Sequence, residues 1–78
     1  MNMNSDFYQT SDLSLATTLS LYFPIESVDK SDLKRVSFIF KRSKEFDAIL
    51  KSYWREEIDV KPQKFFSQMK IIKTRIYG

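Results

Sequence analysis

Three cationic side chains surround Ser43, the residue expected to cap a helix that begins near position 44. The first turn of a helix presents free backbone N–H groups and the positive end of the helix dipole, so cations are unfavourable there unless an anion is bound. At 100° per residue, Lys51 and Arg55 share the helix face of Lys44. This pattern predicts a surface that contacts the phosphates of a nucleic acid rather than its base edges. The residues are Lys41, Arg42, Ser43, Lys44, Lys51 and Arg55.

The same cations have a second interpretation as an ordinary solvated helix face. Glu45 and Asp47 place negative charge in the first turn, which offsets the conflict with the dipole. Asp47 also precedes Lys51 by four residues, the spacing of an ion pair along a helix. On this interpretation these cations are in contact with solvent and bind no ligand.

The sequence lacks most of the residue types from which catalytic and metal sites are built. The chain has no histidine and no cysteine, and its one glycine is the last residue, Gly78. It therefore lacks a side chain that ordinarily titrates near neutrality, a thiolate, and a glycine-rich phosphate loop. Glu56, Glu57 and Asp59 form one acidic cluster without a second at metal-ligand spacing. We expect a non-enzymatic binding protein with no cofactor and no metal.

A protein partner is the alternative to a nucleic acid. Residues 13–24 contain no charged side chain although they read as a helix. An uncharged helix face is easier to desolvate than a charged one, and interface cores are depleted of charge. Leu13, Thr17 and Leu21 are the predicted contacts, in a homodimer or in a small modulator of a larger complex.

Length and composition indicate one small globular domain. The 78 residues are 42% hydrophobic and 15% aromatic, enough rings for a dense core. Basic residues are concentrated at the C-terminal end, where residues 61–78 hold five cations and no acid. The absence of cysteine, of a secretory segment and of a long apolar run favours a cytoplasmic location and no membrane partner.

The apolar spacing predicts the elements that must position these surfaces. A tail at residues 1–6, expected to be disordered, precedes a single domain at 7–78. Strands are expected at 7–9, 25–28 and 35–41, and helices at 12–23, 43–57 and 62–77. The fold class is α+β, in the order β-α-β-β-α-α, with a three-stranded, mostly antiparallel sheet packed against helices. Six aromatic residues fall on inward periodicities and are expected in the core: Phe38, Phe40, Tyr53, Trp54, Phe65 and Phe66.

Several short runs are similar to a known family. They are TSDLSLA at 10–16, FIF at 38–40, YW at 53–54, VKPQKF at 60–65 and the closing helix at 70–77. In these runs the chain resembles a family of small uncharacterised domains from bacteria and their phages. The shared positions are core and capping residues, so the resemblance implies a common fold and no catalytic residues. It associates the chain with a regulatory or nucleic-acid setting only indirectly.

Overall fold

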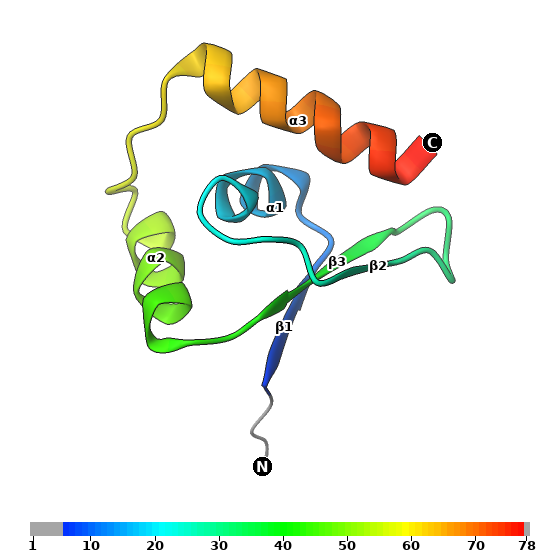
Figure 1. The fold of residues 1–78 in the computed structure, drawn as a ribbon, viewed down its shortest axis with the longest axis horizontal. Helices are drawn as coiled ribbons and strands as arrows, with labels where there is room; N and C mark the ends of the chain where they lie inside the picture. Colours follow the sequence, from blue (N-terminus) through cyan, green and yellow to red (C-terminus); the bar gives the residue numbers. More distant parts are fainter. Residues whose placement is uncertain (1–5, 78) are drawn as a thin grey trace.

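Strand β3 (Ser37–Lys41) is the centre of a three-stranded sheet in the computed structural model, which describes residues 6–77 (Figure 1). It pairs antiparallel with β1 (Phe7–Thr10) on one side and with β2 (Ser27–Asp29) on the other. Because side chains alternate along a strand, Phe38 and Phe40 both point to the covered face, where they are buried. This is the strand pattern that the sequence predicts.

Helix α1 (Leu13–Ser20) lies between the sheet and the C-terminal helix (Figure 1). Asp12 caps it, because one of its carboxylate oxygens accepts a hydrogen bond from the Leu15 N–H at 3.1 Å. The helix ends at Ser20 and is followed by a turn in which the Phe23 N–H bonds to the Leu19 carbonyl. Five consecutive residues, Leu15 to Leu19, are buried, so the middle of this helix is covered on every side.

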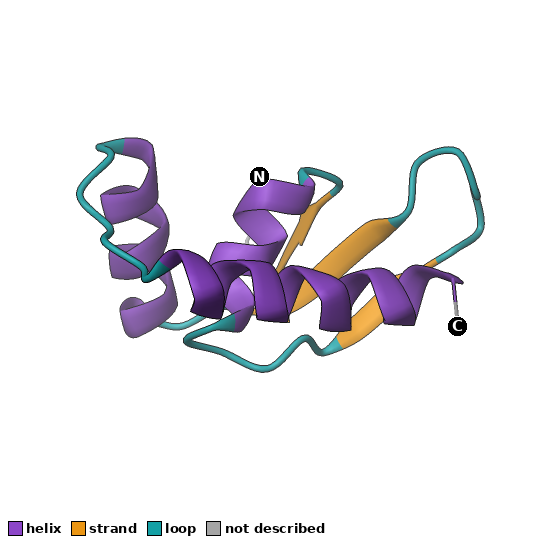
Figure 2. Ribbon diagram, turned by 90° about the horizontal axis from the view of Figure 1, so that it is seen from above, coloured by secondary structure: helices purple, strands orange, loops and turns teal. Residues whose placement is uncertain are grey.

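Two further helices complete the helical layer that covers one face of the sheet. Helix α2 (Lys44–Trp54) lies at one end of the sheet, and α3 (Pro62–Tyr77) crosses over α1 (Figures 1 and 2). Side-chain hydrogen bonds attach both of them to α1. The Tyr53 hydroxyl donates to the Ser14 hydroxyl at 3.2 Å, and the Gln68 amide donates to the Ser20 hydroxyl at 3.0 Å. Helix α1 is therefore the central element of the helical layer.

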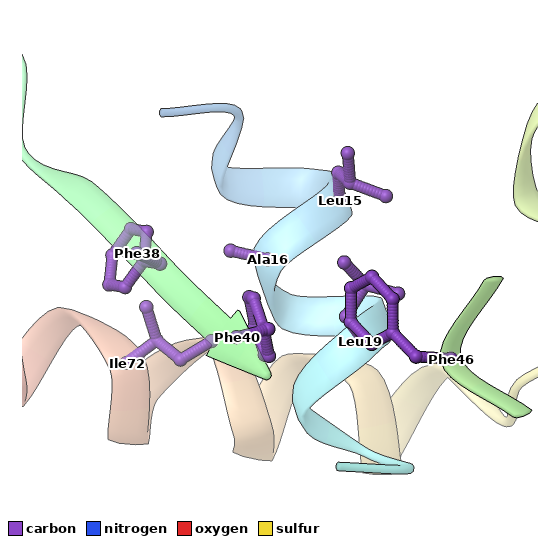
Figure 3. Close-up of a cluster of buried hydrophobic side chains, with 7 residues drawn as sticks. All are labelled: Leu15, Ala16, Leu19, Phe38, Phe40, Phe46 and Ile72. Carbon is purple, nitrogen blue, oxygen red and sulfur yellow. The ribbon is translucent and has the colours of Figure 1, made fainter. Parts of the chain in front are cut away.

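The core draws one or more side chains from every helix (Figure 3). Phe46 of α2 is fully buried, and its ring centroid lies 5.3 Å from that of Phe23 and 5.7 Å from that of Phe40. Ile72 is the buried residue of α3. Among residues 6–77, the buried apolar side chains of this core are Leu15, Ala16, Leu19, Phe38, Phe40, Phe46 and Ile72.

The predicted fold class is confirmed: the chain is a small α+β domain in the order β-α-β-β-α-α. All the strand pairs are antiparallel. Of the tail expected to be disordered, residues 1–5 lie outside the described residues. The remaining residue, Asp6, accepts a hydrogen bond from the Arg42 N–H at 2.8 Å through its carbonyl.

Candidate nucleic-acid interface

Helix α2 begins at a residue whose side chain caps the first turn. Ser43 is the N-cap, and its hydroxyl oxygen accepts a hydrogen bond from the Phe46 N–H at 3.0 Å. This bond occupies the oxygen and leaves the hydroxyl proton available as a donor. The acids Glu45 and Asp47 stand in the first turn, where they are favourable to the helix dipole.

Arg42 forms a bidentate ion pair with Asp47 across the start of α2. Its Nη2 lies 3.0 Å from one carboxylate oxygen and its Nε lies 3.2 Å from the other. The hydrogen bond and the charge of Asp47 raise the pKa of Arg42 above its ordinary value. The interpretation that Asp47 pairs with Lys51 is wrong, because the turn into the helix brings Arg42 to the same carboxylate in a planar, two-bond geometry.

The structure brings three of the predicted nucleic-acid-binding residues together on one groove. Arg42, Lys51 and Arg55 line a shallow depression of about 490 Å³ on the outside of α2. We call it the basic groove, and the described residues that line it are Arg42, Asp47, Leu50, Lys51, Trp54 and Arg55. A second, smaller depression of about 270 Å³ is lined in part by Lys41, Arg42 and Ser43, so Arg42 belongs to both. Lys44 is exposed and lines neither of the two.

Carboxylates are interleaved with these cations. Residues 41–57 hold five cations and four acids, so the segment as a whole is nearly neutral. In the basic groove itself, by contrast, three cations face one carboxylate, and that carboxylate is already paired with Arg42. The local excess of positive charge comes from the way the helix distributes its side chains, because Glu45, Glu56 and Glu57 do not line this groove.

The predicted protein interface on the first helix is not an exposed face. Thr17 is fully buried and Thr18 is only 5% exposed. Ser20, which shares the face of Thr17 one turn further along α1, bonds to Gln68 of α3, so α3 packs on this side of α1. Their hydroxyls donate to the carbonyls one turn earlier, at 2.7 and 3.0 Å, so no hydroxyl donor is left unsatisfied. Leu13 and Leu21 are half-buried, and Leu13 packs against the core. The prediction that Thr17 points outward is therefore wrong: the partner of this uncharged face is a helix of the same chain.

A second groove, between α2 and α3, was not expected. Trp54 and Phe66 were predicted in the core but are each 60% exposed. Trp54 is exposed because it is the last residue of α2 and no described element covers its side chain. With Tyr53 and Phe65, these two rings line a groove of about 750 Å³, here called the aromatic groove. Its remaining walls are Thr18, Glu56, Ile58, Val60 and Pro62.

The chain reverses sharply between the two grooves. After α2 the Glu57 N–H bonds to the Ser52 carbonyl at 2.9 Å and the Glu56 N–H bonds to the Tyr53 carbonyl at 3.0 Å. This is the Schellman pattern, and it requires a left-handed residue, here Glu56 with φ of 58°. Glycine ordinarily takes this position, so a glutamate there stores backbone strain.

Other kinds of site find no support within residues 6–77. No three His, Cys, Asp or Glu side chains of this part of the chain gather where they could hold a metal ion. None of the helices described there combines the length and the apolar character that crossing a membrane requires.

Comparison with known proteins bears on the family of the chain and not on its activity. No curated protein and no solved structure matches it. The model of one family does match, over residues 5–78, and confirms the resemblance to a family without an assigned function. Since this match covers nearly the whole sequence, the chain belongs to the family described as a domain of unknown function, DUF5659.

Proposed function

We propose that this protein is a non-enzymatic nucleic-acid-binding domain that contacts phosphates through the basic groove of α2. The observation that carries the proposal is the convergence of Arg42, Lys51 and Arg55 on one groove. Cationic side chains that neutralise phosphates release the counterions condensed on the nucleic acid, which is the main source of sequence-independent affinity.

The Arg42–Asp47 pair is compatible with this role. A guanidinium has five N–H donors, and Asp47 occupies two of them, those on Nε and Nη2. The remaining donors are free to bond a phosphate oxygen. Lys51 and Arg55 are exposed on the same groove and form no ion pair with a described residue. They are the cations we expect to contribute most.

The test is the salt dependence of binding to a labelled oligonucleotide. For each phosphate contacted, the logarithm of affinity should fall with the logarithm of salt concentration with a slope of about −0.7 for a single strand or −0.9 for a duplex. Removing two contacts, in Lys51→Gln with Arg55→Gln, should flatten the slope by about 1.4 to 1.8. Both side chains are exposed, so the fold should be unaffected.

A matched control is available on α3. Lys70→Gln with Lys73→Gln removes the same charge from exposed positions outside the basic groove. An equal loss in this control would show that binding follows net charge and not this groove. Wild-type protein that binds neither DNA nor RNA, single- or double-stranded, at low salt would refute the proposed function.

A cytoplasmic location and the lack of catalysis belong to the same proposal. They rest on the absence of cysteine and histidine from the sequence.

A further inference from the structure

Trp54 belongs to both grooves. It lines the basic groove together with Arg42, Lys51 and Arg55, and it lines the aromatic groove together with three other rings. Its own ring is 60% exposed. A ligand that extends from one groove to the other must therefore pass over an exposed indole.

The rings of the aromatic groove are arranged in two perpendicular pairs. Tyr53 and Trp54 meet at 84° with centroids 5.2 Å apart, and Phe65 and Phe66 meet at 79° with centroids 5.8 Å apart. In an edge-to-face pair, one ring uses its edge and keeps its flat faces open to other partners. Trp54 and Phe66, one from each pair, are the more exposed rings. Flat, exposed rings are the surfaces on which unpaired bases stack.

Charge orients a nucleic-acid strand across the two grooves. Of the described residues that line the aromatic groove, Glu56 alone is charged, and its carboxylate repels phosphates. The basic groove, which Trp54 also lines, attracts them through three cations. The backbone is therefore favoured in the basic groove, and the uncharged bases are favoured in the aromatic groove.

We propose that the aromatic groove stacks the unpaired bases of a single-stranded nucleic acid whose phosphates lie in the basic groove. The inference rests on the proposed function, since it assigns the class of nucleic acid bound at the same site. A duplex keeps its bases stacked inside the helix and cannot offer them to Trp54. The groove therefore selects single strands over duplexes.

The experiment compares two strands that differ only in their bases. One is an oligothymidylate of about twelve nucleotides, and the other is an abasic strand of the same length and charge. Wild-type protein should bind oligothymidylate about ten-fold or more tightly than the abasic strand. Trp54 is the only tryptophan of the chain. Because it lines both grooves, quenching of its fluorescence by oligothymidylate that the abasic strand does not produce reports base stacking.

Variants separate the two grooves. Phe66→Ala, which removes an exposed ring that lines the aromatic groove and not the basic groove, should lower the affinity for oligothymidylate towards that for the abasic strand, with the salt slope unchanged. Tyr77→Ala is the control, because it removes an aromatic ring that is 84% exposed and lines neither groove. It should keep the preference for oligothymidylate. Thermal melting of each variant shows that the fold is retained.

Failure of the base-stacking proposal can be distinguished from failure of the proposed nucleic-acid binding. Equal affinity of wild-type protein for both strands, or binding without quenching of Trp54, would overturn base stacking and leave the phosphate contacts intact. Binding of neither strand would refute the proposed function itself.

Discussion

Thr17→Lys should unfold much of this protein. Thr17 is fully buried in α1 beneath α3, and its hydroxyl bonds to the Leu13 carbonyl at 2.7 Å. A lysine there must either bury its charge or lose its proton. Losing the proton at pH 7 costs about 4–5 kcal/mol, because the ordinary pKa is about 10.4 and each unit is about 1.36 kcal/mol. The extra side-chain atoms add about 1–3 kcal/mol of overpacking.

That total, about 5–8 kcal/mol, is comparable to the whole stability expected for the domain. At 0.05–0.15 kcal/mol per residue, a chain of 78 residues is stable by about 4–12 kcal/mol. Thr17→Val keeps the shape of the side chain and removes only the hydroxyl, so it should change stability by about 1 kcal/mol or less. Ser67→Lys adds the same charge to an exposed position on α3 and should have little effect.

The measurement is urea or thermal unfolding followed by circular dichroism. For a domain of this size, about 1 kcal/mol corresponds to a shift in Tm of about 4–8 °C. A folded Thr17→Lys protein whose Tm is within about 4 °C of wild type would refute the burial of this face under α3. If sedimentation then showed that the substitution dissociates a wild-type dimer, the first-helix interface would be restored.

Four further substitutions test other parts of the structure. Phe46→Ala should destabilise the fold by about 3–5 kcal/mol in urea unfolding, because its buried ring packs against Phe23 and Phe40; a loss below about 1 kcal/mol would contradict that packing. Glu56→Gly should raise the Tm by a few degrees, since glycine relieves about 0.5–1 kcal/mol of strain at the left-handed position, whereas Glu57→Gly should not. Asp47→Asn should strengthen oligonucleotide binding at low salt, because it frees Arg42 and removes the carboxylate of the basic groove; weaker binding would mean that the pair positions Arg42. The Ser31 N–H lies 2.9 Å from the Asp29 carboxylate and holds the pKa of Asp29 below its ordinary value. The stability that this hydrogen bond contributes is therefore present above about pH 4 and is lost as the pH falls through the lower pKa of the folded state. The difference in Tm between wild type and Asp29→Asn should shrink correspondingly between about pH 5 and pH 2.

Features that depend on neighbouring residues along the chain could be predicted from the sequence. The alternation that buries Phe38 and Phe40 is a property of five consecutive residues in a strand. The caps Asp12 and Ser43 each bond to an N–H three residues later, so the signal and its partner lie within one turn. The cations of the basic groove lie close together because α2 and its start are continuous in sequence. Local geometry suffices for all of these.

The predictions that Thr17 is exposed and that Trp54 is buried were both wrong. Periodicity identifies the apolar side of a helix, but it does not tell which other element, if any, covers each side. Residues 13–24 carry no charge, and a helix without charge all round is typical of a buried one. The absence of charge therefore indicated burial, but burial against a partner protein and burial against a second helix of the same chain give the same pattern. Trp54 shares the inward periodicity of Phe46 and is nevertheless exposed.

The sequence by itself determined the elements, their caps, the central strand and the cationic face of α2. The tertiary structure alone decided that Thr17 is buried and that Trp54 joins two grooves. The physical reason is the range of the interactions. Caps and alternation act within a few residues, whereas the burial of α1 depends on a helix that begins more than forty residues later and packs against it only after the chain has folded back.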